Sequence, residues 1–326
     1  MSNRLYFPGQ GRFRLRWPLR EFLEEWRAVR EGMARYRARG ADTARYLLRR
    51  NLHRIEKGLM MPGARSVFAA EYIAETVSAY ELLRREGGCE AREDLRAAQG
   101  VLTAYFARVA AHPAVDEARR RFESLPPAEA PGEGNDILPF HQDELGPAPL
   151  SPEQLLAALR HRKSIRWFLQ RPVPREHLDR AVAAAALAPS ACNRQAFRYH
   201  ILDTPDRVRA AASLLLGVSG FDHQIPVLVV VVGCLRGYEH SRDRHLIYVD
   251  GGLSAMNFML ALDTLGLASC PVNWPDRPRE NRQLAALLNL APDERAVMLM
   301  AVGYPDPDGA VARSPRKSVA DLRTYS

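Results

Sequence analysis

Residues 225–233 read IPVLVVVVG, the longest apolar run in the 326-residue sequence. β-branched residues dominate it, and they favour a strand that is buried on both faces. The run is far shorter than the ~20 residues that a membrane-spanning helix needs. We therefore predict a buried strand at 227–232 and no membrane span.

Helix and strand patterns alternate on both sides of this run, which indicates a layered α/β or α+β sandwich. Ser151 and Gln154 have the spacing of a capping box, and Gly266 is placed to end a helix. The predicted helices are 151–162, 176–187 and 248–265, and the further predicted strands are 198–202 and 297–302.

The first 123 residues have another pattern, with apolar residues at helical three- and four-residue spacing. Residues 124–150 are rich in proline and glycine, which exclude a long helix or a central strand. The sequence thus predicts a helical region at 1–123, a linker at 124–150 and a second domain at 151–326. The predicted N-terminal helices are 19–39, 43–57, 68–85 and 92–111.

The net charge of +8 resides in the first 50 residues, which hold 13 arginines against 5 acidic residues. A basic arm of this kind can bind nucleic acid or an acidic membrane surface. A solvated helix face is the simpler interpretation, so we do not expect nucleic-acid binding. The segment lacks the apolar core of a secretory signal.

The four cysteines show no CxxC spacing, so the sequence predicts neither a disulfide framework nor a metal site. This usage fits a cytoplasmic protein. No histidine is tied to Cys192 or Cys270, so we expect both to be small core residues rather than nucleophiles.

Residues 161–168 read HRKSIRWF and carry the first chemical signal. In an extended chain alternate side chains share a face, so Arg162, Ser164 and Arg166 can point together at one anionic, hydroxyl-rich ligand. Guanidinium groups bind phosphate through paired hydrogen bonds, which suits a nucleotide-like cofactor. The alternative is a solvated basic surface.

Three further segments follow in order: APSACNRQAFR at 188–198, the residues from Asp250-Gly251-Gly252 through Asn257 in the predicted helix 248–265 that leads into GLASCPVNW at 266–274, and GYP at 303–305 with ARSPRKSV at 312–319. Together with residues 161–168 they resemble the nitroreductase family of FMN enzymes. The resemblance covers residues 151–326. It implies an α+β fold in which helices sandwich a mixed sheet, with the N-terminal helical region as an extension.

The resemblance also implies how the chain holds FMN. Arg162, Lys163 and Ser164 would bind its phosphate and ribityl chain, and Arg316 would complete the phosphate site. Many relatives have a second basic residue where this chain has Ser314, and Arg313 is the expected substitute.

Arg166 would lie near the N1/O2 edge of the isoalloxazine, where a cation favours the reduced flavin. The partner subunit of a homodimer would supply the residues that pack on the flavin, namely Pro189, Ser190, Ala191 and Asn193.

The strand around residue 272 would line the flavin through Pro271, Val272 and Asn273, with the Asn273 amide facing N5. Relatives often carry glutamate and glycine where this chain has Asn273 and Trp274. We expect Trp274 to shape the substrate side, and this departure leaves the substrate open.

The implied activity is that of an FMN-dependent oxidoreductase that passes hydride or electrons from NAD(P)H, through flavin N5, to an electron-poor small molecule. No residue stands out as a catalytic acid or base. No GxGxxG fingerprint is present, so NAD(P)H would bind transiently over the flavin. Two alternatives stay open: a biosynthetic FMN-dependent oxidase or dehydrogenase, and a catalytically silent flavin-binding or scaffold protein.

Residues His53, Glu56 and Lys57 share one face of the predicted helix 43–57. We interpret them as a buried polar cluster that ties this helix to its neighbours, with a ligand or catalytic role as the alternative.

Overall fold

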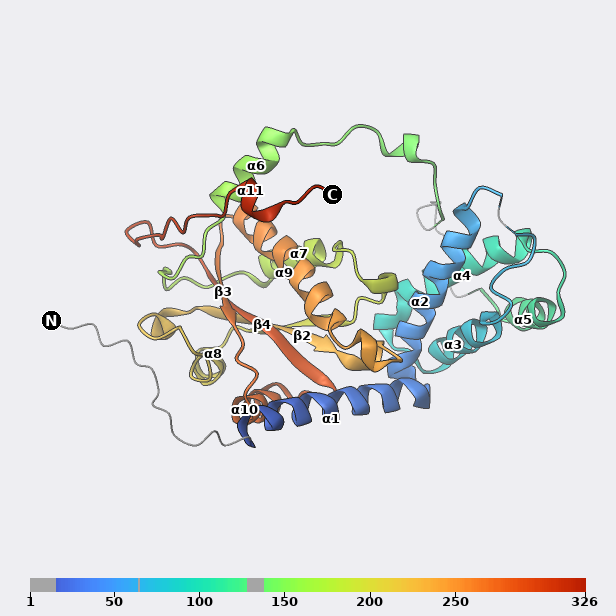
Figure 1. The fold of residues 1–326 in the computed structure, drawn as a ribbon, viewed down its shortest axis with the longest axis horizontal. Coiled ribbons are helices and arrows are strands. Elements are labelled where there is room, and N and C mark those ends of the chain that lie inside the picture. Colours follow the sequence, from blue (N-terminus) through green and yellow to red (C-terminus); the bar gives the residue numbers. More distant parts are fainter. Residues whose placement is uncertain (1–15, 64, 128–137) are drawn as a thin grey trace.

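The computed structural model describes residues 16–63, 65–127 and 138–326. An α+β body and a helical lobe beside it make up this part of the chain (Figure 1). The α+β class is the one that the sequence predicted. The start of the basic arm and the middle of the predicted linker lie outside the described residues.

The sheet of the body has the strand order β1-β2-β4-β3, and each neighbouring pair is antiparallel. Every residue of β2 is buried, which confirms the strand predicted at 227–232. An isolated bridge between Ser164 and Ser269 adds one parallel contact beside β3, outside the four named strands. The mixed sheet that the resemblance implied is therefore an antiparallel sheet with a parallel bridge at its edge. The strands are β1 (Phe197–Leu202), β2 (Val227–Cys234), β3 (Ala268–Asn273) and β4 (Glu294–Gly303).

Helices cover both faces of the sheet because the side chains of β2 alternate between them. Val229 and Val231 pack with the helices of one face, and Leu228 and Val230 pack with those of the other. Complete burial of such a side chain contributes about 1.5–3 kcal/mol. The first face carries α7 (Arg175–Ala186) and α9 (Leu246–Thr264), and the second carries α8 (Pro205–Ala212) and α10 (Pro278–Leu288).

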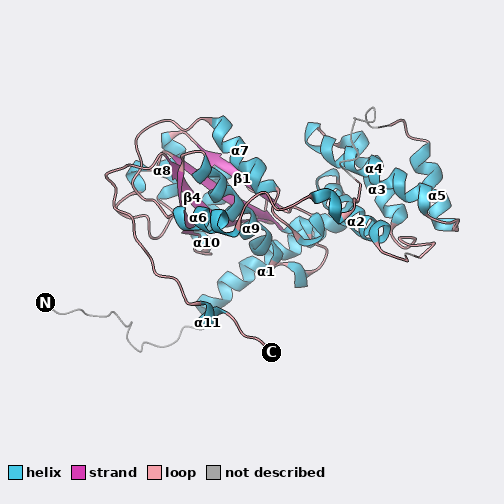
Figure 2. Cartoon of the chain, turned by 90° about the horizontal axis from the view of Figure 1, so that it is seen from above, coloured by secondary structure: helices cyan, strands magenta, loops and turns pink. Residues whose placement is uncertain are grey.

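The N-terminal helices divide between the lobe and the body. Helices α2 to α5 share a core that Tyr36 of α1 joins, and α1 also packs on the body through Ala28 and Val29. Gly32 makes this contact possible, since a Cβ there would lie 2.7 Å from the backbone of Leu235. Figure 2 shows the lobe to one side of the sheet. The helices are α1 (Arg16–Ala38), α2 (Ala41–Met60), α3 (Ile73–Glu86), α4 (Arg92–Arg108) and α5 (Pro113–Glu123).

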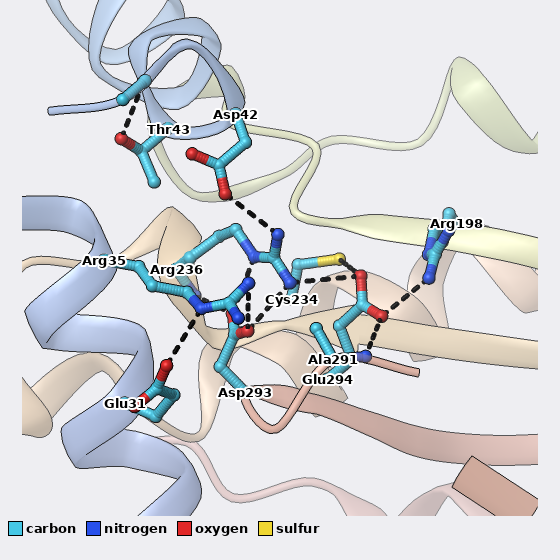
Figure 3. A network of polar contacts seen from close by, with 11 residues as sticks. Glu31, Arg35, Asp42, Thr43, Arg198, Cys234, Arg236, Ala291, Asp293 and Glu294 are labelled. Carbon is cyan, nitrogen blue, oxygen red and sulfur yellow. Dashed lines mark hydrogen bonds and ion pairs between the residues drawn. The ribbon is translucent and has the colours of Figure 1, made fainter. Parts of the chain in front are cut away.

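A buried ionic network fastens α1 and α2 to the end of the sheet (Figure 3). The carboxylate of Asp293 is fully buried and accepts two hydrogen bonds from the guanidinium of Arg236, both at 2.7 Å. Arg236 also contacts Asp42 of α2 at 3.0 Å, and Arg35 of α1 lies 3.4 Å from Asp293. Because the charges are paired at close range, the network can be stable although it is shielded from water.

The remaining elements lie on the outside of the body. Helix α6 (Pro152–His161) begins with the predicted capping box between Ser151 and Gln154, and it has no buried residue. Helix α11 (Val319–Leu322) lies in an exposed C-terminal segment. None of the described helices is long and apolar enough to cross a membrane. The short 3-10 helices are η1 (Cys89–Ala91), η2 (Gln142–Leu145), η3 (Ala191–Asn193), η4 (Asp222–Gln224), η5 (Leu235–Gly237) and η6 (Ser241–Asp243).

Candidate functional site

The segment that follows α6 runs beside β3 in the extended form that the sequence predicted. Ser164 forms the parallel bridge with Ser269, and the backbone N–H of Ile165 donates to the carbonyl oxygen of Ser269 at 3.1 Å. Side chains at alternate positions of this segment therefore point in opposite directions.

Arg162 carries the clearest sign of a binding site. Its Nε and Nη1 atoms are buried and have no hydrogen-bond partner among the described residues, and the same holds for Oγ of Ser269. A buried donor without a partner costs about 1–3 kcal/mol, and a charged one costs more. This arrangement suits a ligand that brings anionic and hydroxyl oxygens.

Arg166 shares this neighbourhood with Arg162. Burial raises the pKa of the Cys270 thiol, and the guanidinium groups of Arg166 and Arg162 oppose the shift, so both lie near β3. Cys270 is 2% exposed, which confirms it as a core residue. The structure therefore gathers Arg162, Arg166 and β3 on one side of the body.

Lys163 lines a separate hollow of about 520 Å³, and Arg313 of the C-terminal segment lies in the same hollow. The ring Nδ1 of His161 contacts Asp263 at 2.7 Å on its wall. Two of the predicted basic residues, distant in sequence, thus meet at the C-terminal end of α9.

Arg316 is exposed, and its Nη1 donates to the carbonyl oxygen of Ser314 at 2.8 Å. Arg316 and Arg162 are both cationic donors, so they could meet only through a shared acceptor such as a phosphate. Their convergence on one phosphate stays a prediction.

The end of β3 presents Asn273 to solvent, while Pro271 and Val272 lie in the strand before it. The next residue, Trp274, is only 6% exposed, and its indole N–H donates to Oδ1 of Asn281 at 2.8 Å. The Trp274 ring packs in the core on the α8 and α10 side. The role predicted for Trp274 on the substrate side stays a prediction.

The loop at 189–195 has an unusual backbone for residues that are not glycine. Cys192, Asn193 and Gln195 have φ angles of 52°, 52° and 53°, in the left-handed region. Cys192 is half-exposed in this loop, so the expectation that it is a core residue is wrong. The hydroxyl of Ser190 accepts the backbone N–H of Gln195 at 3.0 Å.

Helix α9 separates the two halves of the predicted flavin site. The loop is attached at Asp250, near the start of α9, because the backbone N–H of Ala191 donates to that carboxylate. His161, next to Arg162, contacts Asp263 near the end of the same helix. At ~1.5 Å per residue, the two attachment points lie about 20 Å apart.

Three residues that hold the loop were not predicted. Asp250 lies inside α9, which begins at Leu246. Its carboxylate also accepts a hydrogen bond from the hydroxyl of Tyr238 at 3.1 Å. The guanidinium of Arg194 is buried, lies 5.3 Å from the centre of the Tyr238 ring and donates to the carbonyl oxygen of Ala191. The sequence signal that could have revealed Asp250 is an acidic residue within an otherwise apolar helix pattern.

The cluster on α2 is half-exposed rather than buried. His53 lies 3.7 Å from Glu56 within the helix, and both side chains are about one-third exposed to solvent. Burial lowers the pKa of His53, and Lys57 acts in the same direction. The prediction that this cluster is buried is therefore wrong, whereas its tie to neighbouring helices stays a prediction.

Comparison with known proteins places the body in a family. Residues 159–219 and 214–304 match the model of the Nitroreductase family. Iodotyrosine deiodinase 1 of Sus scrofa is 22% identical over 201 residues, which are 52% of this chain and 68% of the deiodinase. Iodotyrosine deiodinase of Nematostella vectensis is 21% identical over 196 residues, which are 51% of this chain and 72% of that protein.

Two solved structures illustrate the similarity. An FMN-dependent nitroreductase from Clostridium difficile is 20% identical, with a TM-score of 0.43 over 51% of this chain and 94% of that one. A nitroreductase family protein from Streptococcus pneumoniae is 19% identical, with a TM-score of 0.46 over 53% of this chain and 100% of that one. The α+β body of this chain belongs to the nitroreductase family.

Proposed function

We propose that the chain is an FMN-dependent oxidoreductase that takes hydride from NAD(P)H and reduces an electron-poor small molecule. The observation that carries this proposal is the pair of unpartnered, buried donor atoms on Arg162 beside the unpartnered hydroxyl of Ser269. Bound FMN would supply the hydride-accepting and hydride-donating group.

The residues around Arg162 fit such a cofactor. A phosphate offers oxygen acceptors to a guanidinium, and a ribityl chain offers hydroxyls that pair with a serine. We assign phosphate and ribityl binding to Arg162 and Ser164, with Arg316 approaching from the C-terminal segment, whereas Lys163 and Arg313 line the separate hollow at the end of α9. Arg166 would place positive charge beside the ring system.

We further propose that the site is completed by a second copy of the chain. In one chain the loop at 189–193 and the segment at 162–166 are attached about 20 Å apart along α9. The outer faces of α6 and α9 expose large apolar side chains, which a partner would cover. The half-exposed or exposed residues are Leu155, Leu156 and Leu159 on α6 and Val249 and Leu253 on α9.

Oligomeric state tests this part of the proposal. Leu253→Asp places a charge on the exposed face of α9, and sedimentation velocity should then show a monomer where the parent is a dimer. Leu216→Asp is the matched control, because Leu216 is also exposed and lies away from these two helices. A monomeric parent would overturn the proposed dimer.

The reaction is tested on the purified protein. We expect a yellow protein with the two visible absorption bands of bound flavin, and anaerobic NADPH or NADH should bleach them. A flavin that binds but is not bleached by either nicotinamide would support the biosynthetic oxidase or dehydrogenase alternative. No flavin in the protein and no uptake of added FMN would overturn the proposal and favour a scaffold. The substrate is proposed only as a class, and electron-poor aromatic compounds are suitable probes.

A further inference from the structure

The loop at 190–195 holds a conformation that its own residues disfavour. Cys192, Asn193 and Gln195 are all left-handed, and such a backbone costs roughly 1–2 kcal/mol for residues other than glycine and asparagine, here Cys192 and Gln195. A loop of this kind persists only when contacts around it fix it. The contacts that fix the loop are therefore part of the site to which the loop belongs.

Contacts from the body fix the beginning of the loop. The N–H of Ala191 donates to Asp250 at 3.1 Å, and Nη1 of Arg194 donates back to the carbonyl oxygen of Ala191 at 2.9 Å. Neither of these hydrogen bonds involves the backbone carbonyl of Arg194, which lies at the other end of the loop.

The helical lobe supplies that contact through Arg49 of α2. Its Nη1 donates to the carbonyl oxygen of Arg194 at 3.3 Å, across 145 residues of sequence. Its Nε is held by the carboxylate of Asp94 in α4 at 2.5 Å. Asp94 is buried, so the guanidinium of Arg49 is fixed between the lobe and the loop.

Arg45, one turn earlier on α2, offers a natural comparison. Its Nε binds the other oxygen of Asp94 at 2.8 Å, and its Nη2 donates to the carbonyl oxygen of Glu90. Both arginines therefore pair with the same carboxylate. Of the hydrogen bonds that these two arginines make with described residues, only the one from Arg49 reaches the loop.

We propose that Arg49 is a positioning residue for the flavin site, and that the helical lobe is thereby part of that site's architecture. This inference rests on the proposed function, in which the loop packs on FMN. Arg49 would act through the backbone of Arg194 and not by touching the cofactor. The chemistry that it supports is the binding of FMN in one fixed orientation.

The test compares Arg49→Met with Arg45→Met in the full-length protein. Both variants remove one arginine from Asp94, and only Arg49→Met frees the loop. We expect Arg49→Met to weaken FMN binding about tenfold, as loss of one hydrogen bond to a charged donor predicts. The visible circular dichroism of the flavin at saturating FMN should change in the same variant. Arg45→Met should keep the parent values of both.

Hydrogen exchange of the FMN-free protein separates this inference from the proposed function. Amides of residues 190–197 should exchange faster in Arg49→Met than in Arg45→Met, whether or not the parent binds FMN. Arg49→Lys keeps a charge beside Asp94, so its FMN affinity and its loop exchange should lie between those of the parent and Arg49→Met. This variant replaces Arg49→Met in the test if Arg49→Met does not fold. Equal FMN affinity and equal loop exchange in Arg49→Met and Arg45→Met would overturn the inference. If the parent takes up no FMN and the loop of Arg49→Met still exchanges faster than that of Arg45→Met, Arg49 anchors the loop but has no role in flavin binding.

Discussion

The backbone N–H of Ala191 donates to the carboxylate of Asp250, with 3.1 Å between nitrogen and oxygen. This contact joins a left-handed loop to the buried side of α9 across 59 residues of sequence. Asp250 is 2% exposed, and the hydroxyl of Tyr238 completes its hydrogen bonding. The loop predicted to pack on a flavin is thus held by the interior of the body.

Asp250→Ala should lower the free energy of unfolding by about 2–4 kcal/mol, because it leaves the Ala191 N–H and the Tyr238 hydroxyl without an acceptor. Asp250→Asn should cost less, since its carbonyl oxygen can still accept one of the two bonds. Burial raises the pKa of the Asp250 carboxyl, so the neutral amide also avoids part of the desolvation cost. Urea unfolding measures both changes, and an Asp250→Ala variant as stable as the parent would contradict this role.

Replacement of Asp293 tests how the helical lobe is fastened to the sheet. Asp293→Ala leaves Arg236 without its main partner inside the protein and should cost about 3–5 kcal/mol. Asp276→Ala is the control, because Asp276 also pairs with an arginine, Arg295, but is 45% exposed. Exposed pairs contribute at most about 1 kcal/mol, so thermal unfolding should distinguish the two variants. Similar losses in both would show that the buried network does not fasten the lobe.

Stability should fall in mild acid because of His200. Burial lowers the pKa of His200 below the ordinary value of 6.5. The charges of Arg198 and Arg207 lower this pKa further, and the charge of Glu294 opposes them. The unfolded chain therefore binds a proton at a higher pH than the folded chain does. Stability is present in full above pH 6.5 and is lost as the pH falls below that value, by at most about 1.4 kcal/mol per pH unit.

His200→Gln should flatten this slope, as measured by melting temperature between pH 5 and 7. His223→Gln, at an exposed position, should keep the slope of the parent. A parent and a His200→Gln variant with equal slopes would assign the acid sensitivity to other groups.

Elements with strong local patterns were predictable from the sequence. The apolar run at 225–233, the capping box at Ser151 and the helix end at Gly266 all have local causes, and the structure contains each of them. The extended form of residues 162–166 also followed from their alternation. Boundaries were less accurate: the helix predicted at 68–85 begins at Ile73, and the one predicted at 92–111 ends at Arg108 before a separate α5.

The contacts that hold the site could not be predicted in the same way. Asp250 meets Ala191, and Arg49 meets Arg194, only because the fold brings distant segments together. No spacing in the sequence marks such pairs. Trp274 illustrates the same limit, since its burial depends on α10, a helix that the apolar pattern did not reveal.

The central claim is that Arg162 binds an anionic group of FMN, and an FMN titration of Arg162→Gln tests it most directly. Arg160→Gln is the matched control, because it removes the same charge from an exposed position two residues away on α6. We predict that the parent and Arg160→Gln bind FMN with equal affinity and that Arg162→Gln binds at least about tenfold more weakly. Equal binding by Arg162→Gln and the parent would contradict the account.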